Sequence, residues 1–130
     1  MKVLDATFLI DYLEGVDAAT GYLKEHSTER FVVPAPAFAE ALVGEGKGPD
    51  ESDIEGVRDA LSWGEVYSVD ERTAVIAAEI ADDMGSQGPF LSGMDAMIAA
   101  VGRELDAPVV SRDRHLAHPE TKQVVDVEEY

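Results

Sequence analysis

Cysteine is absent from this chain of 130 residues. Its absence excludes disulfide bridges, thiolate metal sites and cysteine nucleophiles. Long apolar runs are also missing, and none approaches the ~20 residues that a membrane-spanning helix requires. An acid already stands at position 5, which is too early for the apolar stretch of a signal peptide. We therefore expect a cytoplasmic protein with no membrane association.

Basic residues are scarce. The chain has 10 basic and 27 acidic side chains, a net charge of −17, and its acids are spread along the sequence rather than gathered in a tail. Such a surface suits a cytoplasm with molar salt, so we expect a halophilic source. At 1 M salt the Debye length is roughly 3 Å, and the surface would not repel a polyanion from a distance. Without that salt, the charge argues against a nucleic-acid role.

The alternation of short apolar strands with helical segments predicts the fold class. With 45% hydrophobic residues and no repeat, residues 1–130 fit one globular domain. The expected strands are residues 2–5, 31–33, 66–69, 109–110 and 124–125. The expected helices are residues 6–14, 17–26, 36–43, 53–63 and 70–84, and a last helix that begins at a Ser92–Asp95 capping box and ends before Pro108, with a loop at 44–53. This order indicates parallel βαβ units and a three-layer α/β sandwich.

Four acids stand where such a fold places functional groups. Asp5 follows the first strand, and Asp113 lies just beyond the strand at 109–110. Glu40 falls in the helix after the second strand, and Asp95 lies in the first turn of the helix before residue 109. Sites in parallel sheets form outside the carboxyl ends of the strands, so these carboxylates can converge on one edge. Clustered carboxylates favour a hard cation such as Mg²⁺ or Mn²⁺, which can activate water and stabilise the leaving oxygen of a phosphodiester.

Each acid also has an ordinary structural interpretation. Asp5 can cap the first helix, Asp95 can be the acidic member of its capping box, and Asp113 can cap the short segment at 114–118. Glu40 is one of 14 glutamates and can be an ordinary surface residue. The set of four is more informative than any single member.

Two hydroxyls stand two residues from an acid. Thr7 follows Asp5 and Ser111 precedes Asp113. Both can orient a carboxylate or a metal-bound water, or make ordinary turn and cap hydrogen bonds.

Basic residues are dense at one place only, where Arg112, Arg114 and His115 surround Asp113. These side chains can contact phosphate groups of a substrate, or simply balance the neighbouring acids.

Three segments resemble one known family. Residues 3–13 (VLDATFLIDYL) resemble the start of PIN domains, residues 92–100 (SGMDAMIAA) their central acid motif, and residues 111–116 (SRDRHL) their late hydroxyl-x-Asp motif. Glu40 in FAEAL stands where the family has its second acid. Ala6 replaces the Thr that is commoner in the family. The resemblance runs almost the whole length, and length and pattern are closest to VapC-type toxins of toxin–antitoxin pairs.

The resemblance implies a PIN-like sheet of about five parallel strands and an endoribonuclease that depends on Mg²⁺ or Mn²⁺. By matching position, Asp5, Glu40, Asp95 and Asp113 would be the catalytic metal ligands, with Thr7 and Ser111 as supporting hydroxyls. An RNA substrate, a small VapB-like antitoxin and a homodimer are further implications.

Two other functions remain open from the sequence. One keeps the fold as a PIN nuclease for RNA processing or DNA cleavage without a toxin role. The other is a non-catalytic, acidic protein-binding module, against which the four intact acids argue.

Overall fold

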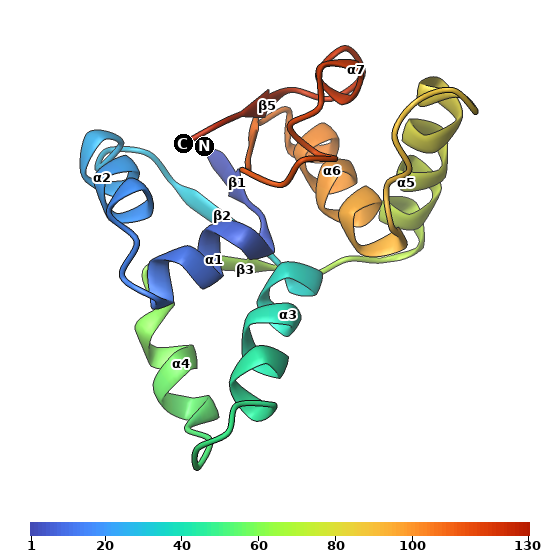
Figure 1. Cartoon of the computed structure of the whole chain (residues 1–130). Coiled ribbons are helices and arrows are strands. Elements are labelled where there is room, and N and C mark those ends of the chain that lie inside the picture. Colours follow the sequence, from blue (N-terminus) through green and yellow to red (C-terminus); the bar gives the residue numbers. More distant parts are fainter.

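Five parallel strands form the centre of the molecule in the computed structural model (Figure 1). They are β1 (Lys2–Leu4), β2 (Phe31–Pro34), β3 (Glu65–Tyr67), β4 (Val109–Val110) and β5 (Val127–Glu128). The strand order is β3-β2-β1-β4-β5, and every neighbouring pair is parallel. The predicted α/β class with a five-stranded parallel sheet is therefore confirmed.

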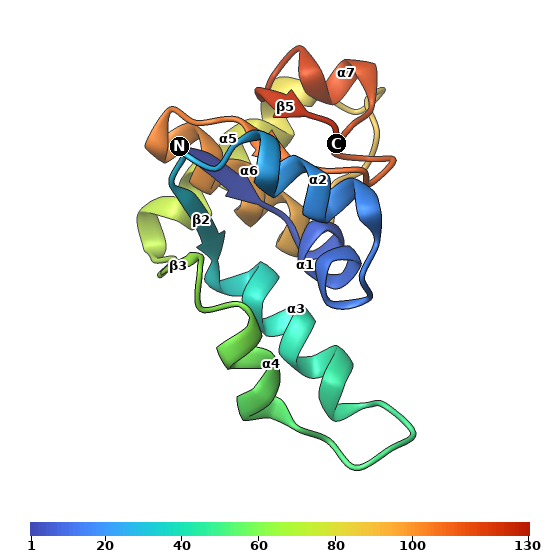
Figure 2. The ribbon, with the colours of Figure 1, turned by 90° about the vertical axis from the view of Figure 1, so that its left-hand side faces the viewer.

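Helices flank this sheet in two groups. The helices are α1 (Ala6–Leu13), α2 (Asp17–Glu25), α3 (Ala35–Gly46), α4 (Ile54–Ala60), α5 (Glu71–Met84), α6 (Gly93–Leu105) and α7 (Pro119–Lys122). Helices α5 and α6 lie side by side, whereas α3 contacts both α1 and α4 (Figure 1). The α3–α4 pair projects away from the sheet (Figure 2).

The three inner strands are buried and apolar except for the partly exposed Lys2 at the start of β1. Val3, Leu4, Val109 and Val110 are completely buried, and β2 is buried along its whole length. Parallel strands that carry helices on both faces need continuous apolar runs of this kind. The register places Leu4 beside Val110, so the residues that follow β1 and β4 leave the sheet at the same edge.

Several predicted boundaries were wrong. Helix α3 continues through Gly46, although the sequence predicted a loop from residue 44, and α4 ends at Ala60 rather than at residue 63. The last strand is Val127–Glu128 rather than residues 124–125, because the amides of both valines there donate to the carbonyl of Thr121 and close the unpredicted helix α7.

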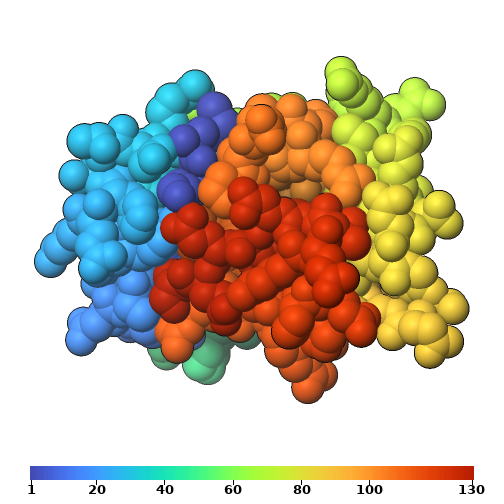
Figure 3. Space-filling view, turned by 90° about the horizontal axis from the view of Figure 1, so that it is seen from above, coloured from blue at the N-terminus to red at the C-terminus, as the bar shows by residue number.

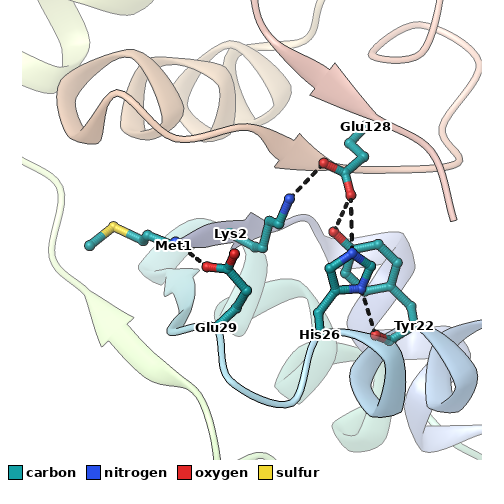
Figure 4. Close-up of polar contacts among 6 residues, drawn as sticks. All are labelled: Met1, Lys2, Tyr22, His26, Glu29 and Glu128. Carbon is teal, nitrogen blue, oxygen red and sulfur yellow. Dashed lines mark hydrogen bonds and ion pairs between the residues drawn. The ribbon is translucent and has the colours of Figure 1, made fainter.

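Strand β5 near the C-terminus forms polar contacts with the first 26 residues of the chain. The Glu128 carboxylate accepts hydrogen bonds from Lys2 Nζ at 2.8 Å and from the Tyr22 hydroxyl, and His26 Nε2 lies 3.8 Å from it (Figure 4). These contacts join β1, α2 and β5, which no local pattern could connect. Seen from above, the C-terminal segment, coloured red, lies between the blue segment that contains α2 and the yellow segment that contains the end of α5 (Figure 3).

No helix has the length and apolarity that crossing a membrane would require.

Candidate metal centre

Asp5 is the most buried carboxylate of the chain, with 2% of its surface exposed. It is the N-cap of α1, where its Oδ1 accepts the backbone N–H of Phe8 at 2.9 Å. Its Oδ2 accepts short hydrogen bonds from the hydroxyls of Thr7 and Ser111. Three donors thus fix the orientation of this carboxylate. Asp5 therefore caps α1, as its ordinary structural interpretation predicted.

Burial raises the pKa of Asp5 from its ordinary value of 3.8 to about 6. The three hydrogen bonds, of which the bond from Ser111 has the largest effect, lower this pKa and so offset part of the effect of burial, while the charge of Asp113 raises it slightly. A carboxylate held in this environment favours a neighbouring positive charge, because a cation would stabilise its ionised form.

Ser111 links the ends of two strands. It follows β4 directly, and the pairing of Leu4 with Val110 brings it beside Asp5. Its hydroxyl donates to Asp5 and accepts the backbone N–H of Asp113 at 2.9 Å. Ser111 is completely buried, so this bridge is shielded from water and keeps the Asp5 and Asp113 segments together.

Asp113 stabilises a tight turn through one carboxylate oxygen, Oδ1, and its other oxygen is available to a ligand. Its Oδ1 accepts the backbone N–H groups of His115 at 2.9 Å and Leu116 at 3.1 Å. These bonds form the cap that the sequence offered as an alternative to a metal-binding role for Asp113. Because a carboxylate has two oxygens, Oδ2 can serve a ligand at the same time.

Asp95 lies in the first turn of α6, where only half of the predicted capping box forms. Ser92 Oγ accepts the backbone N–H of Asp95 at 3.1 Å, but the Asp95 carboxylate does not return a bond to the Ser92 backbone. Burial raises the pKa of Asp95, the charge of Asp113 raises it further, and contacts with Ser92 and His115 lower it. The Asp95 carboxylate therefore makes no capping hydrogen bond and lies close to Asp113.

Glu40 reaches the same site from α3. Its side chain is more exposed than the other three, yet partial loss of hydration raises its pKa, and the charges of Asp95 and Asp113 add to the effect. Asp5, Glu40 and Asp95 therefore each interact through their charge with Asp113. Asp5 couples to Asp113, and Glu40 couples to both Asp95 and Asp113.

The closest group of donor atoms contains two of these acids and a histidine. Ligand atoms of Asp95, Asp113 and His115 all lie within 4.8 Å of one another. Two ligands on opposite sides of an Mg²⁺ ion lie about 4.2 Å apart, since each bond is about 2.1 Å. Two carboxylates and an imidazole at this spacing, with Glu40 and Asp5 nearby, form a donor set that fits a divalent cation of the Mg²⁺ or Mn²⁺ class.

The three basic residues near Asp113 occupy different environments. Arg112 packs over the ring of Tyr130, with its Cζ 5.2 Å from the ring centre, and lies 3.9 Å from Asp11 Oδ2. Arg114 is exposed and forms no ion pair. Only His115 lies among the acids. Sequence reasoning grouped it with the substrate-contacting cations, although its Asp-x-His spacing after a strand end was the available signal for a ligand.

Comparison with known proteins agrees with this geometry. The PIN domain family model matches residues 2–122, which is most of the chain, so the chain belongs to the PIN domain family. Comparison with curated proteins gives no significant match.

Solved structures show the same fold over nearly the full length. The chain is similar to VapBC2 from Rickettsia felis, solved with a DNA fragment from its promoter, with 16% identity, a TM-score of 0.82, and 99% of this chain and 98% of that chain covered. It is also similar to FitAcB from Neisseria gonorrhoeae, with 19% identity, a TM-score of 0.79 and 100% and 96% covered. A toxin–antitoxin complex from Klebsiella pneumoniae gives 20% identity, a TM-score of 0.75 and 92% and 94% covered.

Proposed function

We propose that this protein is a metal-dependent endoribonuclease that hydrolyses RNA phosphodiester bonds. The observation that supports the proposal is the cluster of Asp95, Asp113 and His115, whose ligand atoms lie within 4.8 Å of one another, with Asp5 and Glu40 close enough for their charges to interact with that of Asp113. Mg²⁺ or Mn²⁺ at such a site would activate water and stabilise the charge on a departing oxygen.

The residues of the chain divide this task. Asp95 and Asp113 would hold the ion directly, with Glu40 beside them at the more open rim. Thr7 and Ser111 fix Asp5, whose buried charge attracts the cation and orients its surroundings. Arg112 and Arg114 are exposed and could contact substrate phosphates, and Arg112 also packs over the ring of Tyr130.

An assay with a mixed RNA pool tests the proposal. The pool is incubated in molar KCl with Mn²⁺, Mg²⁺ or EDTA, using the wild type, Asp95→Asn and Asp59→Asn. Asp59 is exposed on α4 and forms no ion pair, which makes it a matched control. We expect metal-dependent cutting by the wild type and by Asp59→Asn, and none by Asp95→Asn. Full activity of folded Asp95→Asn would show that Asp95 does not hold a catalytic metal ion, and would contradict the proposed metal centre.

We further propose that the nuclease, residues 1–130 as one domain, is the toxin of a VapBC-type pair and acts in the cytoplasm. The toxin–antitoxin complex from Klebsiella pneumoniae, which has this fold, supports a small antitoxin as the partner here. The homodimer rests on the resemblance of the sequence motifs to the VapC-type toxins alone. The charge of −17 would hinder RNA binding in dilute buffer, so we also propose that the protein works in high salt.

Two observations would separate the toxin from a PIN nuclease of RNA processing or DNA cleavage. A gene for a small antitoxin next to this one, together with a narrow set of RNA cleavage sites, supports the toxin. If the folded wild type neither cuts RNA nor binds Mn²⁺, a non-catalytic protein-binding module becomes the better explanation.

A further inference from the structure

The three histidines of the chain differ in what their rings contact. Nδ1 of His26 lies 2.9 Å from the carbonyl oxygen of Tyr22, and Nδ1 of His118 accepts the backbone N–H of Glu120 at 3.1 Å. The ring of His115 makes no hydrogen bond within the chain, although it lies within 4.8 Å of carboxylate oxygens of Asp95 and Asp113. An imidazole in this position has a ring nitrogen available for a ligand.

Hydrogen bonds fix the backbone of His115 at both its N–H and its carbonyl group. Its N–H donates to Asp113 Oδ1 at 2.9 Å, and its carbonyl accepts the hydroxyl of Thr121 at 2.6 Å. Thr121 is completely buried, so this second contact is anchored in the core. The turn that orients Asp113 therefore also orients His115, and only side-chain rotation is needed to bring both to one ion.

We propose that His115 donates a ring nitrogen to the metal centre and gives it a preference for Mn²⁺ over Mg²⁺. This inference rests on the proposed metal-dependent nuclease. Mg²⁺ is a hard ion that binds oxygen ligands and retains water, whereas imidazole suits first-row transition metals. A site built only from carboxylates would bind both ions through oxygen. A site with His115 adds a bond that Mn²⁺ uses better than Mg²⁺ does.

The position of His115 among the acids has a competing explanation, in which the ring serves only as a positive neighbour that lowers the pKa of Asp95. The two explanations differ in a measurable way. A positive neighbour would repel the cation, so its removal would strengthen or preserve metal binding. A ligand leaves a nitrogen signal on the bound ion, and its removal weakens the binding of Mn²⁺ more than that of Mg²⁺.

Pulsed electron paramagnetic resonance of Mn²⁺ bound to the full chain tests the inference. The wild type is compared with His115→Gln and with His118→Gln, which removes a histidine that the cluster does not include. We expect ¹⁴N coupling to Mn²⁺ in the wild type and in His118→Gln, and its loss in His115→Gln. Titration should show that His115→Gln weakens Mn²⁺ binding by about 10-fold or more, and Mg²⁺ binding, measured by competition, by less than about 3-fold.

Each alternative result is informative in a different way. Bound Mn²⁺ without nitrogen coupling in the wild type would overturn the role of His115 and leave the proposed nuclease intact. Equal weakening of Mg²⁺ and Mn²⁺ binding in His115→Gln would overturn the ion preference. If folded wild type binds no Mn²⁺ at all, both this inference and the proposed metal centre fail.

Discussion

Replacing Asp5 by Asn should stabilise the metal-free protein while it abolishes activity. Burial raises the pKa of this carboxyl from 3.8 to about 6. One pKa unit corresponds to about 1.36 kcal/mol, so keeping Asp5 ionised at neutral pH costs the fold about 3 kcal/mol. Asn has almost the same shape and carries no charge. It should recover up to about 3 kcal/mol, less the cost of replacing one acceptor oxygen by an NH₂ donor, because the hydrogen bonds from Thr7, Ser111 and Phe8 cannot then all be kept.

The pH dependence has a definite sign. Between about pH 4 and pH 6 the folded protein holds a proton on Asp5 that the unfolded chain has already released. The free energy of unfolding of the wild type therefore falls, relative to Asp5→Asn, as the pH rises through this window. At pH 5 roughly half of the cost is present, and above about pH 7 nearly all of it is.

Urea unfolding in EDTA at pH 5 and pH 7.5 measures this difference, with Asp59→Asn as the exposed control. We expect Asp5→Asn to be the more stable protein, by a margin that increases with pH, and Asp59→Asn to stay within about 0.5 kcal/mol of the wild type. Mn²⁺ at 1,000 times its Kd should reverse the order, because a ligand at that concentration stabilises the protein that binds it by about 4.1 kcal/mol. An Asp5→Asn protein that is less stable than the wild type at pH 7.5 in EDTA would refute the reasoning.

Three further predictions concern the bridge at Ser111, the acidic surface and the C-terminal segment. Ser111→Ala removes a hydrogen bond to a buried carboxylate, so we expect a loss of about 1.5 to 3 kcal/mol in urea unfolding and weaker Mn²⁺ binding by calorimetry. The melting temperature should rise from dilute to molar KCl, since salt screens the repulsion among 27 acids. Tyr22→Phe removes one hydrogen bond to Glu128 and should cost about 1 kcal/mol, with RNA cleavage unchanged.

Different results would contradict each of these. Unchanged metal affinity in Ser111→Ala would mean that the bridge between the ends of β1 and β4 does not support the site. A melting temperature that is highest in dilute buffer would exclude the salt hypothesis. Loss of RNA cleavage in folded Tyr22→Phe would show that the contacts of β5 with α2 affect the catalytic edge.

Much of the fold was predictable because its signals are local. Apolar triplets such as Phe31–Val33 predicted strands, and cap residues such as Ser92 and Asp70 predicted where helices begin, since caps and periodicity involve neighbours in sequence. The last strand was misplaced because residues 124–125 are as apolar as a strand. Only the turn around the buried Thr121 shows that they close a helix.

The sequence by itself determined the parallel α/β order, the absence of thiol chemistry and the positions of four acids at strand and helix ends. These features follow from residue types and short spacings. The tertiary structure decided which of the acids meet. The pairing of β1 with β4 puts Ser111 against Asp5 across 106 positions. The packing of α6 against β1 and β4 places Asp95 near Asp113 and His115. Two further features depend on the tertiary structure: only one of the two capping-box hydrogen bonds forms at Asp95, and Asp5 is buried away from water. Burial and long-range contacts exist only once the helices pack on the sheet.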